Sequence, residues 1–423
     1  MTKKKPQTVA QKILARKSCK PDVSSGEIVE AEPDAVMSHD NAALVIKQFR
    51  EIGVERVWNR EKIVIVLDHR IPAESVKTAN AHKAIREFVR EQSLTHFYDM
   101  GEGICHQVVL EKGHALPGEL VLGTDSHTTS YGAVGAFSTG IGATEMAAVW
   151  ATGKLWLKVP ETIRVVLNGK LRPGVYAKDA ILHVIGRMGA EGANYRSIEF
   201  TGDATAGFSV SERITMANCA MEMGAKCAFF KADDVVDCYV RSVTKRPTAP
   251  VFADPDAEYT QTVDCNIGIL EPQLACPHQV DRVQPVSRWL GKPIHQAFLG
   301  SCTNGRLDDM EIAAGFLRGK KIHPGVRMIV IPASRSIFRD MVQRGFLDIF
   351  LNAGCVVLHP GCGPCLGAHQ GLLADGETCL ASSNRNFQGR MGSSKAEIFL
   401  ASPAVVAVSA LNGSIQLPDV FKP

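Results

Sequence analysis

Short apolar segments rich in β-branched residues alternate along this chain with longer stretches in which apolar residues recur at helical spacing. This alternation is typical of α/β layers with mainly parallel sheets. Five of the apolar segments end just before residues that can carry chemistry, namely residues 63–67, 120–122, 297–299, 356–358 and 379–381. We predict that each of the five is a strand.

Polar residues and cysteines follow these predicted strands. The residues concerned are Asp68 and His69, then Asp125, Ser126 and His127, then Cys302, Cys362 and Asn384. In open α/β sheets, ligands bind beyond the carboxyl ends of the strands, where loops and helix N-termini meet. The pattern therefore predicts one shared cleft that is lined by all five strand ends.

Two changes in composition divide the chain into three parts. The first lies near Pro160, after a helical stretch rich in alanine and tryptophan, and the second lies in the proline-containing stretch 272–293. We predict three α/β domains, at residues 1–161, 162–285 and 286–423.

Composition and charge exclude several classes of protein. The 423 residues are 45% hydrophobic and 22% charged, which is ordinary for a soluble globular protein. The formal charge of +3 is small and the basic residues are scattered, so nucleic acid is not an expected partner. No apolar run has the length or position of a membrane span or a secretion signal. Since the twelve cysteines form no regular framework, we expect reduced thiols and a cytoplasmic protein.

One glycine-rich stretch imitates a nucleotide-binding motif. Residues 140–145 begin like a dinucleotide fingerprint, but Glu145 stands where the third glycine belongs, and the chain has no P-loop sequence. We interpret the stretch as a tight turn into a helix, and we expect no nucleotide cofactor.

Three cysteines have a spacing that suits metal chemistry. They are Cys302, in Gly-Ser-Cys-Thr-Asn, and the pair Cys362 and Cys365, in Cys-Gly-Pro-Cys. Three thiolates suit a cubane iron–sulfur cluster that leaves one iron free for a substrate. A redox dithiol or half of a zinc site are the alternatives for the Cys-x-x-Cys pair alone.

Two carboxylate–imidazole pairs occur at predicted strand ends. A carboxylate beside a histidine orients the ring and raises its pKa, which suits a proton donor to a departing hydroxyl group. Each pair on its own, Asp68 with His69 or Asp125 with His127, is more typical of a structural turn than of a catalytic pair. The occurrence of two such pairs favours catalysis. His106 alone would most often be a core histidine.

A predicted helix and a later loop offer further contacts. Ser209 and Glu212 form a capping-box pattern, and Asn218 and Glu222 share a face of the helix that follows. On the helical pattern alone we favour a solvated face. The loop 384–390 carries two arginines, and since arginine pairs bidentately with carboxylates, it suits a di- or tricarboxylate.

In series, these motifs resemble those of the aconitase superfamily. They are Asp68-His69, then residues 103–107, 124–128, 300–304, 362–365 and 384–390, in the same order as in that superfamily. The resemblance covers almost the whole chain, and six motifs in series are far more specific than any one of them. It implies three α/β domains of aconitase type, with mainly parallel sheets around a central cleft, without the swivelling fourth domain of single-chain members.

The resemblance also implies roles for individual residues. Cys302, Cys362 and Cys365 would hold one [4Fe-4S] cluster. The positions that match catalytic residues are Asp68, His69, His106, Asp125, His127 and Glu222, and those that match substrate contacts are Ser126, Asn218, Asn384, Arg385 and Arg390. His39 stands where single-chain aconitases have glutamine, which fits the isopropylmalate-type branch.

Within the superfamily, the chain resembles the branch of two-subunit isopropylmalate isomerases and homoaconitases. That branch implies dehydration and rehydration of a hydroxy dicarboxylic acid, most commonly 2-isopropylmalate to 3-isopropylmalate in leucine biosynthesis. Homoaconitate, citraconate or methylmalate, and dimethylmalate are alternative substrates. A small subunit, in a heterodimer or heterotetramer, would supply the swivelling domain and its serine base. A cluster-free RNA-binding regulator is the alternative of another class, against which the modest charge argues.

Overall fold

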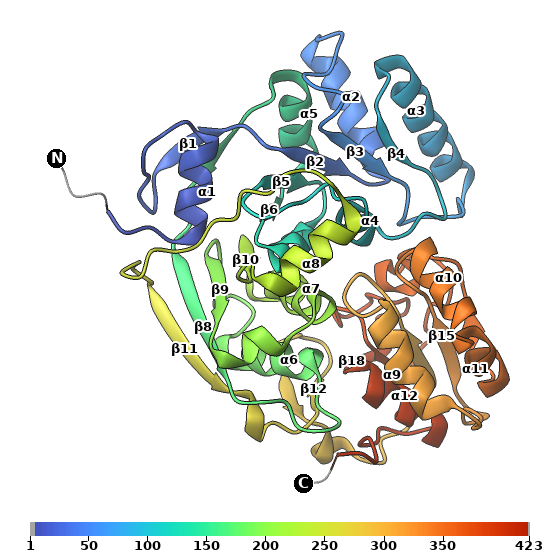
Figure 1. Ribbon diagram of the computed structural model, residues 1–423. Helices are drawn as coiled ribbons and strands as arrows, with labels where there is room; N and C mark the ends of the chain where they lie inside the picture. Colours follow the sequence, from blue (N-terminus) through green and yellow to red (C-terminus); the bar gives the residue numbers. More distant parts are fainter. Residues whose placement is uncertain (1–4, 422–423) are drawn as a thin grey trace.

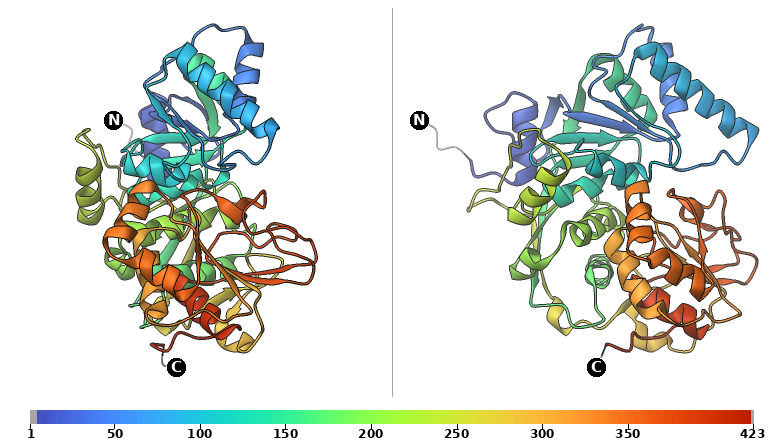
Figure 2. Two further views of the ribbon diagram at one scale, coloured as in Figure 1. Left: turned by 90° about the vertical axis from the view of Figure 1, so that its right-hand side faces the viewer. Right: turned by 45° about the vertical axis from the view of Figure 1, so that its right-hand side comes forward.

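The computed structural model describes residues 5–421, and three main β-sheets with helices packed around them make up most of it (Figure 1). The first sheet and its helices lie at the top of Figure 1, the second sheet at the lower left, and the third at the lower right. The two turned views agree that the first group sits above the other two (Figure 2).

The first sheet is parallel throughout and is covered on both faces. Its strand order is β4 (His96–Tyr98), β3 (Ile63–Val66), β2 (Ala35–Ser38), β5 (Leu120–Gly123), β6 (Phe137–Gly140). Around it lie α2 (Ala42–Ile52), α3 (Val76–Gln92), α4 (Cys105–Glu111), α5 (Ala143–Thr152) and the 3-10 helix η1 (Ser126–Val134). Ile63 and Ile65 join the core made with α2 and α3, whereas Val64 and Val66 join the core made with α4. Because both faces are buried, β3 is apolar at every position.

The second sheet is smaller and also parallel. Its order is β10 (Cys227–Phe229), β9 (Ser197–Thr201), β8 (Thr162–Asn168), β11 (Gln261–Asn266). Its helices are α6 (Ala177–Met188), α7 (Val210–Cys219) and α8 (Asp234–Val243), with 3-10 helices η2 (Asp203–Gly207), η3 (Ala220–Met223) and η4 (Ile267–Ile269). The helix α1 (Val9–Lys17) and the antiparallel pair β1 (Ile28–Ala31) and β7 (Leu155–Lys158) lie beside the first two sheets (Figure 1).

The third sheet is mixed. Its order is β13 (Val283–Pro285), β12 (Gln273–Ala275), β18 (Glu397–Leu400), β17 (Thr378–Ala381), β14 (Gln296–Leu299), β15 (Arg327–Val330), β16 (Val356–Val357). β12 runs antiparallel to both of its neighbours, β13 and β18, and the other neighbouring pairs are parallel. Its helices are α9 (Leu307–Leu317), α10 (Arg335–Gln343), α11 (Phe346–Ala353) and α12 (Pro403–Asn412), with 3-10 helices η5 (Val286–Trp289) and η6 (Gly363–Leu366).

The structure confirms the α/β class and the mainly parallel sheets. All five predicted strands are present, as β3, β5, β14, β16 and β17, and the turn at residues 140–142 leads into α5 as expected. The third sheet takes β12 and β13 from before residue 286, and the domain limits at 161 and 285 stay predictions. Within residues 5–421, every helix is too short or too polar to cross a membrane.

Candidate active site

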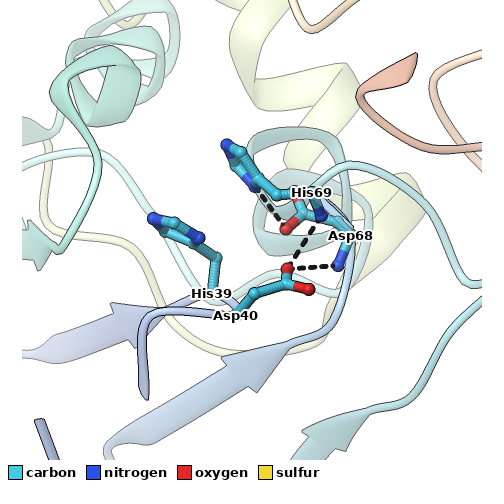
Figure 3. A group of neighbouring side chains, drawn as sticks. All are labelled: His39, Asp40, Asp68 and His69. Atoms are coloured by element: carbon cyan, nitrogen blue, oxygen red, sulfur yellow. Dashed lines mark hydrogen bonds and ion pairs between the residues drawn. The ribbon is translucent and has the colours of Figure 1, made fainter. Parts of the chain in front are cut away.

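The loop after β3 presents Asp68 and His69, and Asp40 holds this loop in place. Asp40 Oδ2 accepts the main-chain N–H groups of Asp68 at 2.9 Å and of His69 at 2.8 Å (Figure 3). Its Oδ1 lies 2.8 Å from Nε2 of His82, a buried residue of α3. Asp68 is itself completely buried, with Oδ1 2.7 Å from His69 Nδ1 and Oδ2 accepting the N–H of Cys105 at 2.7 Å. These contacts fix the His69 ring in one orientation.

The charge state of His69 follows from its neighbours. Burial alone would lower the pKa of His69, but the charge and hydrogen bond of Asp68, with the charges of Asp125 and Asp40, raise it to about 10. The ring of His39 stacks on that of His69, with centroids 4.1 Å apart. Burial and the positive charge of His69 lower the pKa of His39 to about 4. At neutral pH, His69 is an imidazolium and His39 is neutral.

These four residues do not form a convincing metal site. The possible ligand atoms of His39, Asp40, Asp68 and His69 lie within 4.8 Å of one another. The carboxylate oxygens, however, are already engaged with N–H donors and imidazole rings. The carboxylates of Asp40 and Asp68 are therefore occupied, and we assign no metal to these four residues.

Asp125, after β5, connects three histidines. Its Oδ1 lies 2.8 Å from His106 Nε2 and accepts the main-chain N–H of His127 at 2.8 Å, while Oδ2 lies 3.7 Å from His69 Nε2. His106 Nδ1 lies 3.1 Å from the hydroxyl of Tyr131. Burial would raise the pKa of Asp125, but the hydrogen bonds to His106 and His127 hold it well below its ordinary value. Asp125 is thus a permanent anion that orients imidazole rings.

Glu222 joins residues from all three sheet regions. It lies in η3, which continues α7, and its Oε1 is 2.8 Å from His127 Nε2. Arg385, after β17, donates from Nε to both carboxylate oxygens of Glu222 at 3.0 and 3.1 Å and from Nη2 to Ser126 Oγ at 3.1 Å. Burial opposes ionisation of Glu222, yet His127 and Arg385 lower its pKa. Hydrogen bonds to Asp125 and Glu222 raise the pKa of His127 against burial and against the positive charge of Arg385.

Two amides contact the sulfur atoms. Asn218 donates to Cys302 Sγ at 3.2 Å, and Asn384 donates to the same sulfur at 3.4 Å. The Oδ1 of Asn384 lies 3.6 Å from Cys365 Sγ, so one amide touches two of the three thiols. The residue before Cys302, Ser301, has a φ of 82°, a left-handed conformation that is unusual for a residue with a side chain.

Cys302, Cys362 and Cys365 are all buried, near the amides of Asn218 and Asn384. Cys362 and Cys365 flank the start of η6, and the main-chain N–H of Cys362 donates to the carbonyl of Asp68 at 3.0 Å. Cys362 hydrogen-bonds to Cys365 and lowers the pKa of Cys365, and the positive charges of Arg390 and His127 act in the same direction. Burial, and the neighbouring thiol Cys365, raise the pKa of Cys302.

These residues fit a metal cluster held by three thiolates. Amide donors toward sulfur and nearby positive charges stabilise thiolates that bind a metal. One further cysteine, Cys105, lies near enough for Cys302 to affect its pKa, which burial raises well above the ordinary value. The thiol of Cys105 is directed to Asp68 by a hydrogen bond, so we do not count it as a ligand.

The structure brings most of the predicted residues into one network and corrects one interpretation. The solvated helical face that we favoured on the pattern of Asn218 and Glu222 is wrong, because these side chains are only 0% and 7% exposed. The helix α7 packs against η1, and the spacing of apolar residues along α7 does not reveal this long-range contact. Arg390 makes no contact with the carboxylates, but its Nε is buried with no hydrogen-bond partner among residues 5–421.

Sequence reasoning missed three positioning residues. Asp40 follows β2, so the strand-end rule that found Asp68 also applies to it. His82 lies on an ordinary amphipathic helix, which gives no signal. Arg306 is buried and donates to the carbonyl of Cys302 at 2.8 Å and to Ser211 Oγ at 2.8 Å, and no motif marks it.

Comparison with known proteins identifies the class. The chain matches the aconitase family (aconitate hydratase) over residues 11–292 and 287–413, and it belongs to that family. Its relatives narrow the class to hydro-lyases like the large subunit of 3-isopropylmalate dehydratase.

Three relatives illustrate this likeness. The chain is 52% identical to a probable 3-isopropylmalate dehydratase large subunit of Methanothermobacter thermautotrophicus, over 98% of this chain and 99% of the relative. It is 50% identical to a probable methanogen homoaconitase large subunit of Methanosarcina mazei, over 92% and 99%. It is 45% identical to a 3-isopropylmalate dehydratase large subunit of Syntrophus aciditrophicus, over 98% and 99%. A solved structure of aconitase X from Thermococcus kodakaraensis aligns with 87% of this chain and 88% of its own at a TM-score of 0.49 and 11% identity.

Proposed function

We propose that this chain is the large, catalytic subunit of a [4Fe-4S] hydro-lyase that converts 2-isopropylmalate into 3-isopropylmalate in leucine biosynthesis. The observation that carries the proposal is that the three buried thiols lie directly beside the elements that hold the histidines. Asn384 contacts Cys302 and Cys365, and the next residue, Arg385, pairs with Glu222, which contacts His127. The N–H of Cys362 donates to the carbonyl of Asp68, the neighbour of His69. Relatives at about half identity over their full length, named for this reaction, support the choice.

The cluster would be held by Cys302, Cys362 and Cys365. When bound, it supplies a Lewis acid that weakens the carbon–oxygen bond of a hydroxy acid. The protein's own part is to exclude water, which the burial of the thiols does. Burial also raises the thiol pKa values, and the amides of Asn218 and Asn384, which donate toward Cys302 Sγ, favour the thiolate against that effect.

His69 is the proposed acid. Its Nδ1 is bound by Asp68, so the proton on Nε2 is the one available for the departing hydroxyl. The raised pKa keeps that proton in place at neutral pH, and it leaves only as negative charge develops on the oxygen. His106 and His127, oriented by Asp125, would hold the surrounding hydrogen bonds during the same step.

The substrate would be bound by its carboxylates. Arg385 and Arg390 are the proposed cationic contacts, and the free Nε of Arg390 is a donor that a carboxylate would satisfy. Ser126, Asn218 and Asn384 would add neutral hydrogen bonds. A dicarboxylate skeleton is common to every substrate considered for the related branch.

We further propose a small subunit as partner. The relatives are named as large subunits, which supports a small-subunit partner. The partner would bring the swivelling domain, in a heterodimer or heterotetramer, and the complex would be cytoplasmic.

One experiment tests the activity and the choice of substrate together. The chain is coexpressed with an isopropylmalate-type small subunit, the cluster is rebuilt anaerobically with iron and sulfide, and turnover is measured with 2-isopropylmalate, homocitrate, citramalate and 2,3-dimethylmalate. We expect cluster absorption and the highest kcat/KM with 2-isopropylmalate. Stoichiometric zinc without a cluster would refute the hydro-lyase, whereas preference for another acid in the panel would refute only the substrate.

A further inference from the structure

A completely buried lysine lies behind the site and is not part of the network described so far. Lys178, in α6, is 1% exposed and is one of the largest fully buried side chains. Its ammonium donates to the carbonyl of Ser382 at 3.0 Å and to that of Ser383 at 2.6 Å. These two residues directly precede Asn384 and Arg385.

Lys178 lies on a helix of the second sheet region, whereas the loop that it contacts follows β17 of the third sheet. The helix α6 packs against α7 on one side and against β12 of the third sheet on the other. It lies at the centre of the lower half of the molecule, beside β12 (Figure 1). The positive charge of Lys178 also acts on Cys219, where it opposes the rise in pKa that burial causes. The ammonium is thus placed between the helix that carries Asn218 and the loop that carries Arg385.

The other polar groups of Ser382 and Ser383 do not hold the two carbonyls. Ser382 is already tied to the third sheet, through its N–H to the carbonyl of Phe298 at 2.9 Å and through Oγ, which accepts the N–H of Gly300 at 3.0 Å. Ser383 Oγ, by contrast, is buried without a hydrogen-bond partner among the described residues. Since buried carbonyls need donors, the ammonium sets the direction of the peptide groups that lead to Asn384.

We infer that Lys178 is a positioning residue for the substrate and cluster contacts. By holding two successive carbonyls, it sets where Asn384 meets the sulfurs of Cys302 and Cys365 and where Arg385 meets Glu222. An apolar residue of similar length would fill the space but leave both carbonyls without a donor. The inference rests on the proposed function, because it assigns these contacts to substrate and cluster.

The test compares Lys178→Met with a matched core substitution on the same helix. Ile181 is also completely buried in α6, so Ile181→Val controls for loss of packing. Each variant is coexpressed with the small subunit, loaded with cluster, and examined for kcat, KM and the electron paramagnetic resonance spectrum of the reduced cluster. Lys178→Arg, which keeps the charge and the donors, is the conservative variant and the fallback if Lys178→Met does not fold.

We expect Lys178→Met to raise KM about 10- to 100-fold, because a shift of about 1 Å in a binding group has effects of that size. The spectrum should change as well, since Asn384 touches two cluster sulfurs. Ile181→Val should keep the wild-type KM and spectrum, and Lys178→Arg should recover part of the lost affinity.

A Lys178→Met protein with wild-type KM and spectrum would overturn the inference, and so would a Lys178→Arg protein no better than Lys178→Met. If only Lys178→Arg folds, a raised KM below that expected for Lys178→Met, together with an altered spectrum, supports the inference, and wild-type KM and spectrum contradict it. Failure of the proposed function is distinct, because it appears in the wild-type complex as absence of both turnover and cluster.

Discussion

Replacing Asp68 by asparagine tests the assignment of His69 as the acid. Asparagine has nearly the same shape, and its Oδ1 can still accept the N–H of Cys105, which Asp68 Oδ2 accepts at 2.7 Å. The amide nitrogen then faces His69 Nδ1, where the carboxylate lay 2.7 Å away. Two donors would meet as long as the ring is protonated on both nitrogens. The variant therefore destabilises the imidazolium and leaves the local packing intact.

The size of the effect follows from the bond that is lost. A hydrogen bond to a charged group contributes about 1.5–3 kcal/mol, which corresponds to about 1 to 2 pH units at about 1.36 kcal/mol for each unit. The pKa of His69, about 10 in the wild-type chain, should fall to between about 8 and 9 by this reasoning. The orientation of the ring also loosens, so kcat should fall about 100-fold or more even where His69 stays protonated.

Two measurements check this prediction. In the two-subunit Asp68→Asn enzyme, kcat/KM should decline with rising pH at a lower pH than in the wild type. Nitrogen-15 NMR of labelled histidine should show directly that His69 loses its proton at that lower pH. Asp34→Asn is the matched control, because Asp34 also accepts a main-chain N–H, at 2.7 Å from Leu120, and pairs with a lysine, but lies outside the site. An unchanged alkaline limb and an unchanged histidine titration in Asp68→Asn would refute the role of Asp68.

Four further predictions follow from the same contacts. The raised pKa of His69 adds stability that is complete below pH 6.5 and is lost as the pH rises toward about 10, so urea midpoints of the cluster-free chain should fall over that range and fall less in Asp68→Asn. Asp40→Ala leaves the main-chain N–H groups of Asp68, His69 and Arg70 without their acceptor and should lower the free energy of unfolding by about 3 kcal/mol or more in urea titrations, with Asp40→Asn in between. Cys365→Ser should abolish bound iron and sulfide in chemical analysis, whereas Cys105→Ser, whose hydroxyl can still donate to Asp68, should retain both. Arg385→Lys should raise KM about tenfold or more, because an ammonium cannot reproduce contacts to both oxygens of Glu222 and to Ser126.

Local patterns were enough to predict the strands that present the site. In the first sheet both faces are covered, so a strand such as β3 is a continuous apolar run and its last residue is easy to find. The residue after it then lies at the carboxyl edge, whatever the rest of the fold. Asp68 and Asp125 were found in this way, and Asp40 follows the same rule after β2.

Contacts between distant elements were beyond such patterns. The burial of Glu222 depends on η1 and on Arg385, which is 163 residues away along the chain. Lys178 looks like a surface lysine in the sequence, and only the packing of α6 against the third sheet buries it. The family resemblance did bring Glu222 into the predicted site, because a motif series carries long-range information that periodicity does not.

The carboxylates of the site act on the histidines more than on the substrate. Asp68 and Glu222 have both carboxylate oxygens engaged by imidazole rings, main-chain N–H groups or Arg385. Asp125 Oδ1 is engaged by His106 and by the N–H of His127, and its Oδ2 lies 3.7 Å from His69 Nε2. Buried anions that are fully paired repel a dianionic ligand far less than free ones, because their charge is neutralised within hydrogen-bond distance. At the same time they keep His69 cationic, which a dicarboxylate also favours. Loss of one carboxylate should therefore change the protonation of its histidine first and the affinity for substrate only through that histidine.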